Sequence, residues 1–296
     1  MKKQQHIAAS VDLYNTSYDN FAARVQAEIR SETYGEDLGQ SSWMTADELR
    51  RFIRHLKLKP SSHMLEVGSG SGGTALFVAR TVGCRITGLD INASGIRNAN
   101  LLARRQKLHG LAHFQRADAS RRLPFATNSF DAILSNDAMC HLPRREAVLR
   151  EWFRVLKPGG RMLFTDAMVI TGWLANEEIA TRSSIGLYFF LPPGENDRLI
   201  RASGFELTRT EDVTANAAIV AKRWHDARAR REKELVRIEG KANFEGLQKF
   251  LWRVHVFSIE RRLSRYAYLA RKPEIARTAS SRRRSDEMLR KRAMRQ

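Results

Sequence analysis

A glycine-rich bend constrains this chain more than any other feature of its sequence. An apolar segment at residues 63–67 runs directly into Gly68-Ser69-Gly70-Ser71-Gly72, and a helical pattern follows at once. Glycines at such a bend let the backbone approach a ligand without interference from Cβ atoms. The pattern indicates an α/β fold with a nucleotide-like ligand, but dinucleotides and phosphates also bind at turns of this kind.

Strand and helix patterns alternate along the chain after this bend. We expect strands at residues 63–67, 85–90, 112–116, 131–135, 161–166, 205–211 and 264–270. Helices are expected between them at residues 73–82, 94–108, 144–156 and 195–202. This alternation predicts a mostly parallel sheet covered by helices.

Helices are also expected on either side of this alternating region. Apolar residues from Tyr18 to Ile29 recur at helical spacing, and Thr45 with Glu48 has the form of a capping box opening a helix through residue 56. Residues 213–262 read as two helices, with Gly240 and Gly246 as the obvious breaks. These helices either cover the sheet or form a lid over the substrate.

The expected organisation has three parts. Residues 1–59 form an N-terminal helical segment that closes over the cofactor site, and residues 60–273 form the α/β domain with a helical insertion at 213–262. Residues 274–296 form a basic tail, expected to be flexible. From Arg271 onward the chain carries ten basic residues against three acidic ones.

Carboxylates near the bend favour one class of ligand. Asp90 ends the second strand, eighteen positions after Gly72, where a carboxylate can accept hydrogen bonds from both hydroxyls of a ribose. Asp118 follows the third strand, where it can meet the exocyclic amine of an adenine. Glu66 at the entry to the bend would repel a pyrophosphate, so a cationic methionine moiety suits the site better than NAD or ATP.

In their order, these motifs resemble the class I S-adenosylmethionine-dependent methyltransferases. The resemblance rests on LEVGSGSGG at 65–73, GLDIN at 88–92, Ala117-Asp118, FDAIL at 130–134 and VLKPGGR at 155–161, and it spans residues 34–273. It implies a doubly wound, Rossmann-like sheet of seven strands in the order 3-2-1-4-5-7-6. The seventh strand is then antiparallel. The helices expected at 213–262, between the last two strands, are expected to form a helical lid.

The resemblance also implies that S-adenosylmethionine is the cofactor. By motif position its contacts fall on Glu66, Gly68, Gly70, Gly72, Asp90, Ile91, Asp118, Ala119 and Asn136. Simple packing is the alternative role for Ile91 and Ala119. Neither Cys84 nor Cys140 lies in a paired-ligand spacing, so no metal site is expected.

Two stretches resemble small-molecule methyltransferases that act on phosphoethanolamine, sarcosine or dimethylglycine. They are YGED with the two serines at 34–42, and NDAMCHL at 136–142. His141 leaves the carboxyl end of the fourth strand, where open sheets bind ligands, so it is the candidate general base. The resemblance implies that one tyrosine among Tyr14, Tyr18 and Tyr34 bonds to this histidine, and we name Tyr18 as the catalytic candidate.

The methyl acceptor is expected to be a small molecule methylated on nitrogen or oxygen. Tyr34, Arg182 and Tyr188 are the substrate candidates; Arg182, Tyr188 and Arg223 can meet an anionic group, although an arginine on a helix is more often solvated. Phosphobase enzymes follow the Thr165-Asp166 position with a tyrosine, whereas this chain has Ala167. That departure puts phosphoethanolamine in doubt.

Two alternatives remain open. A net charge of +19 is compatible with an RNA or DNA methyltransferase that uses the basic tail. However, the chain has no Asn/Asp-Pro-Pro-Tyr/Phe motif and Cys140 has no preceding proline, so a nucleic-acid partner is the less favoured one. The other alternative is a non-catalytic protein that binds S-adenosylmethionine.

The expected location is the cytoplasm. No apolar run approaches the roughly 20 residues that a membrane span needs. The N-terminal sequence has charge but no apolar core of a secretion signal.

Overall fold

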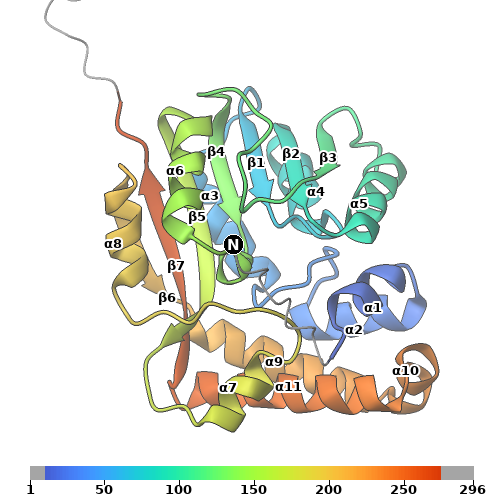
Figure 1. Cartoon of the computed structure of the whole chain (residues 1–296). Helices are drawn as coiled ribbons and strands as arrows, with labels where there is room; N and C mark the ends of the chain where they lie inside the picture. Colours follow the sequence, from blue (N-terminus) through green and yellow to red (C-terminus); the bar gives the residue numbers. More distant parts are fainter. Residues whose placement is uncertain (1–10, 275–296) are drawn as a thin grey trace, which may run out of the picture.

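A seven-stranded sheet forms the centre of the molecule (Figure 1). The structure is a computed structural model and describes residues 11–274. The strands are β1 His63–Val67, β2 Arg85–Asp90, β3 Ala112–Arg116, β4 Phe130–Ser135, β5 Leu156–Ile170, β6 Glu206–Asp212 and β7 Leu263–Arg271. They lie in the order β3-β2-β1-β4-β5-β7-β6, and β7 runs antiparallel to both of its neighbours. The expected fold class and strand order are confirmed.

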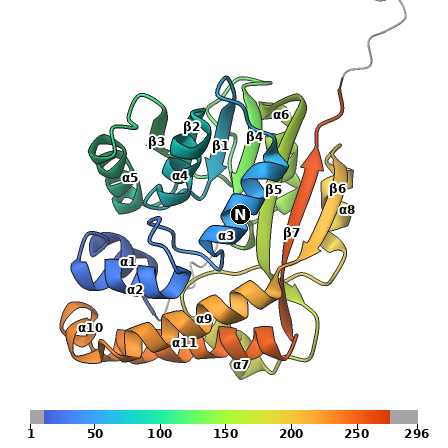
Figure 2. The same ribbon diagram turned by 180° about the vertical axis from the view of Figure 1, so that it is seen from behind.

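Helices cover both faces of this sheet (Figures 1 and 2). One face packs against α3 Ala46–Leu56, α4 Gly73–Val82 and α5 Ala93–Arg105, and the other against α6 Arg145–Val155 and α8 Glu195–Ala202. Successive side chains of a strand point to opposite faces. Met64 and Leu65 of β1 therefore lie in different apolar cores, and each is completely buried.

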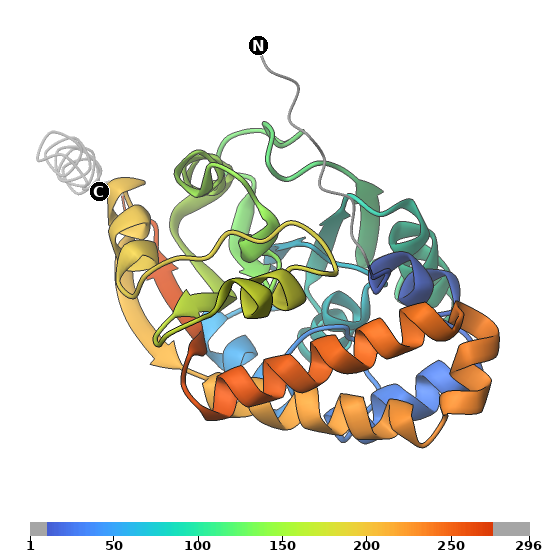
Figure 3. The ribbon, with the colours of Figure 1, turned by 60° about the horizontal axis from the view of Figure 1, so that its bottom comes forward.

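A third apolar core lies below the carboxyl ends of the parallel strands (Figure 3). It joins N-terminal helices to a long helical segment near the other end of the chain, through side chains such as Ile29, Trp224 and Phe250. We call this region the cap. Its helices are α1 Tyr14–Asp19, α2 Arg24–Tyr34, α7 Asn176–Arg182, α9 Thr214–Ala229, α10 Glu232–Glu239 and α11 Lys241–Ile259.

Some elements differ from those expected. The segment after β6 forms three helices rather than two: Gly240 breaks it with φ 79°, but Gly246 lies inside α11. A Cβ on Gly246 would lie 2.6 Å from Cγ2 of Val11, so close packing explains that glycine. The N-terminal region forms two helices rather than one, and α7 was not expected. β5 begins at Leu156, earlier than expected, because Leu156 pairs with Phe130 of β4 and the backbone of Gly159 and Gly160 bonds to Lys272.

Apart from Glu274, the expected basic tail lies outside the described residues. Among residues 11–274, no helix combines the length and the apolar character that crossing a bilayer requires.

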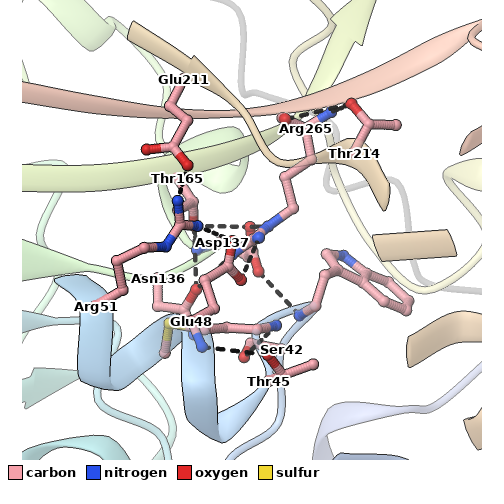
Figure 4. A network of polar contacts seen from close by, with 12 residues as sticks. Ser42, Thr45, Glu48, Arg51, Asn136, Asp137, Thr165, Glu211, Thr214 and Arg265 are labelled. Atoms are coloured by element: carbon pink, nitrogen blue, oxygen red, sulfur yellow. Dashed lines mark hydrogen bonds and ion pairs between the residues drawn. The ribbon is translucent and has the colours of Figure 1, made fainter. Parts of the chain in front are cut away.

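A buried arginine ties α3 and the loop after β4 to strand β7 (Figure 4). Arg265 in β7 donates from Nε to Oδ1 of Asp137 at 2.7 Å and from Nη1 to Oε2 of Glu48 at 2.8 Å. Asp137 follows β4, and its Oδ2 accepts the backbone N–H of Trp43 at 2.9 Å. We call Arg265, Asp137 and Glu48 the clamp. Thr45 does cap α3 by accepting the Glu48 amide, but the Glu48 carboxylate turns to Arg265.

The clamp is almost fully desolvated yet charged. The three side chains are 0%, 6% and 0% exposed for Arg265, Asp137 and Glu48, so water does not solvate their charges. Burial disfavours the guanidinium charge, but the two carboxylates outweigh it and hold the pKa of Arg265 above its ordinary value.

Removing the clamp's cation should destabilise the protein. Arg265→Met should lower the free energy of unfolding by about 3–5 kcal/mol, because it leaves two carboxylates buried without their cation. Arg261→Met is the matched control, since Arg261 forms a largely exposed pair with Asp212 whose loss should cost about 0–1 kcal/mol. Urea unfolding at pH 7 measures both variants. Equal, small losses would contradict a structural role for the clamp.

Candidate active site

The glycine turn joins β1 to α4 at the sheet edge that faces the cap. Gly68, Gly70 and Gly72 have φ values of 77°, 51° and 82°, a conformation that other residues rarely adopt. A Cβ on Gly68 would overlap the side chain of Ala138, and one on Gly70 would lie 2.9 Å from the hydroxyl of Tyr18. The turn therefore needs glycine for its conformation and for the close approach of neighbouring segments.

Asp90 lies beside this turn at the end of β2. Its Oδ2 accepts the N–H of Gly70 and its Oδ1 accepts the N–H of Asn92, both at 2.8 Å. Burial raises the pKa of Asp90, and these amide donors oppose the rise. A carboxylate offers about four lone-pair positions, so the group can still accept hydrogen bonds from a ligand.

Glu66 is a buried acid at the entry to the turn. Glu66 is only 2% exposed, and its Oε2 has no hydrogen-bond partner among residues 11–274. Burial holds the pKa of Glu66 well above its ordinary value, and the charge of Asp90 adds to this effect. A cationic ligand group beside Glu66 would supply the missing partner and favour its ionised form.

The other expected cofactor contacts have varied surroundings. Asp118 accepts hydrogen bonds from Ser120 and Arg121; burial alone would raise its pKa, but these donors lower it. Ile91 is 63% exposed, whereas Ala119 is buried in the apolar core. The side chain of Asn136 is bonded to the clamp, because its Oδ1 accepts Nη2 of Arg265 at 3.1 Å.

His141 ends a short 3-10 turn, Met139–His141, that follows β4. Its Nδ1 lies 2.9 Å from the carbonyl oxygen of Leu187, which can only accept, so Nδ1 carries a hydrogen. Its Nε2 lies 2.8 Å from the hydroxyl of Tyr14. Burial lowers the pKa of His141 to about 4. The imidazole is therefore neutral at pH 7, with Nε2 as a hydrogen-bond acceptor.

The three candidate tyrosines occupy different places. Tyr14 bonds to His141, whereas the hydroxyl of Tyr18 lies against Gly70 of the glycine turn. Tyr14 and Tyr18 lie one turn apart on α1, with ring centroids 6.3 Å apart, so one helix places a tyrosine on each site. The hydroxyl of Tyr34 instead accepts the N–H of Ser42 at 3.2 Å inside the cap.

Two of the substrate candidates lie together beside His141. The Tyr188 ring centroid is 4.3 Å from that of His141, and Cζ of Arg182 is 4.5 Å from the Tyr188 ring. Both candidates are buried, whereas Arg223 is exposed on α9.

Sequence reasoning missed Asp137, Trp43 and Arg265. An arginine inside the strand expected at 264–270 was the available signal for the last of these.

Known proteins share both the sequence pattern and the fold. A model described as a methyltransferase domain matches residues 65–164. An O-methyltransferase of Aspergillus sclerotiorum, resE, is 30% identical over 74% of this chain and 84% of its own length. The 27-O-demethylrifamycin SV methyltransferase of Amycolatopsis mediterranei is 29% identical over 87% of this chain and 96% of its own length.

Longer relatives are matched only in part. The chain spans 64% of a sterol 24-C-methyltransferase from Gibberella zeae, at 29% identity over 70% of this chain. It spans 35% of a glycine/sarcosine/dimethylglycine N-methyltransferase from Actinopolyspora halophila, at 30% identity over 69% of this chain.

A solved structure supports the same assignment of fold. It is phosphoethanolamine N-methyltransferase 2 of Haemonchus contortus, in complex with phosphomonomethylethanolamine and S-adenosylhomocysteine. It matches with a TM-score of 0.73 and 18% identity, over 88% of this chain and 60% of its own. With the motif order, the fold and these relatives together, the chain belongs to the S-adenosylmethionine-dependent methyltransferases, and S-adenosylmethionine is its cofactor.

Proposed function

We propose that this enzyme transfers a methyl group to a nitrogen or oxygen of a small-molecule acceptor, with Tyr14 and His141 taking the acceptor's proton. The observation that carries the proposal is the neutral His141, whose Nε2 meets Tyr14 beyond the end of β4. β4 is the direct neighbour of β1, whose end carries the glycine turn. Relatives named for N- and O-methylation accord with these acceptor atoms, and the sterol relative is named for C-methylation.

The residues around the glycine turn fit the cofactor. The unpartnered Glu66 suits the amino group of its methionine part, and Asp90 suits the two ribose hydroxyls. Asp118 and Ala119 would lie near the adenine, with Ile91 beside it. When bound, the cofactor supplies an electrophilic methyl group, so the protein mainly has to align the acceptor and exclude water.

Tyr14 connects the acceptor to His141. Burial holds the pKa of Tyr14 well above its ordinary value, so the phenol keeps its proton and donates it to Nε2 of His141. The same oxygen can accept an N–H or O–H from the acceptor. The acceptor's proton then moves to the Tyr14 oxygen as the phenol proton passes to His141.

Removing either member of this pair should slow turnover. His141→Ala and Tyr14→Phe should each lower kcat by about 10²-fold and leave the Kd for S-adenosylmethionine unchanged, because neither is assigned a cofactor contact. An untargeted screen of amines, phenols and small acids with labelled cofactor supplies the acceptor for this assay.

Tyr18→Phe is the matched control for Tyr14→Phe. It removes the same atom one helical turn away, beside Gly70, and kcat should fall much less. A loss of kcat at Tyr18 equal to that at Tyr14 would contradict the assignment of Tyr14. A parallel loss of cofactor affinity in His141→Ala would indicate a packing role for the histidine.

Asp90 should govern cofactor affinity. Asp90→Ala should weaken binding of S-adenosylmethionine by about 1–3 kcal/mol, because two ribose hydroxyls lose their acceptor. Asp90→Asn keeps a similar shape but turns an NH2 group toward the N–H of Gly70 or of Asn92, so it should also weaken binding. Isothermal titration calorimetry measures both, and an unaltered affinity in Asp90→Ala would show that the ribose lies elsewhere.

A further inference from the structure

The edge of the sheet opposite the cap carries cations without counter-ions. It is formed by the amino ends of the parallel strands together with the ends of α3, α4 and α5 (Figures 1 and 2). Among residues 11–274, the following cations of this edge form no ion pair: Arg54, Lys57, Lys59, Arg85 and Arg161. We call the side of the molecule that these residues define the basic edge.

Acids near the basic edge do not neutralise these cations. Most of the acids are already bonded to other basic side chains, and Glu274 is the one that forms no ion pair within the described residues. The existing pairs are Asp131 with Lys157, Glu206 with Arg271, and Glu211 with Arg51 and Arg209. The basic edge therefore keeps an excess of positive charge.

Two observations show that cations of this edge lie close to one another. Arg161 of β5 is directly opposite Arg271 of β7 in the antiparallel ladder, and like charges in such a position destabilise a sheet. Burial lowers the pKa of His55, and nearby guanidinium groups, those of Arg209 and Arg161 among them, lower it further. An anion bound across these strands would relieve this repulsion.

The ends of helices account for only part of this charge. α3, α4 and α5 each have basic residues in their last turn, where a cation stabilises the helix dipole. Arg85 and Arg161 lie on strands instead, and a sheet has only a small net dipole. A bound polyanion explains the cations on the strands as well as those on the helices.

The basic edge is long rather than compact. From Arg85 on β2 to Arg209 on β6 it crosses six strands, so with about 4.8 Å between neighbouring strands it is roughly 24 Å long. A nucleic-acid duplex rises about 3.4 Å per base pair, and this length spans about seven base pairs. The chain also continues from this edge, where β7 ends at Arg271, and residues 275–296 include eight basic and two acidic residues.

Exposed apolar side chains are scarce at the basic edge. Among residues 11–274, the large exposed ones are Ile91, Leu101, Trp173, Leu187, Ile219, Trp252 and Ile259. Of these, only Leu101 belongs to a helix that ends at the basic edge. Binding to a bilayer surface is strongest when apolar side chains insert between the lipids. The composition of this edge therefore favours a nucleic acid over a membrane.

We infer that the basic edge binds the phosphate backbone of a nucleic acid, independently of its base sequence. Guanidinium groups bind phosphate oxygens through two parallel N–H groups, and ammonium groups attract them as point charges. The bound nucleic acid is not the methyl acceptor, because the glycine turn and His141 lie at the opposite edge of the sheet. The inference therefore does not rest on the proposed function.

Neutralising three cations of the basic edge tests the inference. The edge variant combines Arg54→Gln, Lys59→Gln and Arg161→Gln in the full chain, and it leaves no acid of residues 11–274 without its partner. Fluorescence anisotropy with a labelled DNA duplex of about 20 base pairs, in about 0.1 M NaCl, measures binding. The edge variant should raise the Kd by at least about tenfold, because three phosphate contacts are lost.

The matched control removes the same charge from the cap. It combines Arg223→Gln, Lys233→Gln and Arg237→Gln, cations of α9 and α10 that also form no ion pair among residues 11–274. Its Kd should stay within about twofold of the wild-type value. An equal loss in both variants would show that only net charge matters and would overturn the inference. No binding by the wild type up to about 10⁻⁴ M duplex would also overturn it.

Salt dependence is the second readout. Each phosphate contact contributes about 0.9 to the slope of log Kd against log salt concentration, so the edge variant should lower this slope by about 2–3. The control variant should keep the wild-type slope. An unchanged slope in the edge variant would contradict contact between these cations and the phosphates.

A second edge variant leaves α3 and β5 unaltered. Lys57→Gln with Arg85→Gln should raise the Kd by at least about threefold, so the test does not depend on the folding of one protein. Both edge variants should keep the wild-type affinity for S-adenosylmethionine, which shows that the fold is retained. Wild-type affinity for the duplex in this second variant would overturn the inference.

Vesicles distinguish a membrane from a nucleic acid. The wild-type protein is centrifuged with vesicles of phosphatidylcholine containing phosphatidylserine, at the ionic strength of the duplex assay. We expect binding to the duplex to be tighter than binding to the vesicles. Binding to the vesicles without binding to the duplex would overturn the inference in favour of a lipid surface.

Discussion

The relative positions of β7, the loop after β4 and α3 depend on the guanidinium of Arg265. One cation bonds the loop after β4 through Asp137 and the first turn of α3 through Glu48. Asp137 in turn holds the backbone of Trp43 and adopts a left-handed conformation, with φ 53°, that asparagine and aspartate tolerate better than most residues. A pairing of buried charges is directional and has few acceptable arrangements. The clamp therefore fixes the N-terminal segment relative to the strand end that leads to His141.

Two chemical environments result at this edge of the sheet. Around the glycine turn, Glu66 and Asp90 are buried acids beside backbone with no Cβ atoms, which suits a cationic nucleoside. Around His141, aromatic rings and Arg182 exclude water and hold the imidazole neutral. The helix α1 joins these two environments, because its Tyr18 lies against the glycine turn and its Tyr14 bonds to His141. Methyl transfer requires this kind of junction, because donor and acceptor must meet in line and away from solvent.

Local patterns determined how much could be predicted from the sequence. The strands and the glycine turn were predictable from the sequence. The alternation of apolar side chains along a strand, and the positive φ that glycine permits, both depend on residues that are close in the sequence. Tyr14 and Tyr18 are four residues apart on one helix face, so spacing alone cannot decide which reaches His141. Arg182 looked like a solvated helix residue, but the fold packs it against the rings of Tyr188, Phe250 and Trp43, which are distant in the sequence or on other elements. The role of Arg265 could be recognised only from the fold, because its two carboxylate partners, Asp137 and Glu48, are distant from it in the sequence.

We propose that one crevice holds the cofactor at the ends of β1 and β2 and presents its sulfur to the Tyr14–His141 pair. A crystal structure with S-adenosylhomocysteine tests it most directly. We expect the ribose hydroxyls on the carboxylate of Asp90, the amino group beside Glu66, and the sulfur directed toward Tyr14. Ribose hydroxyls away from Asp90, or a sulfur facing away from His141, would contradict the account.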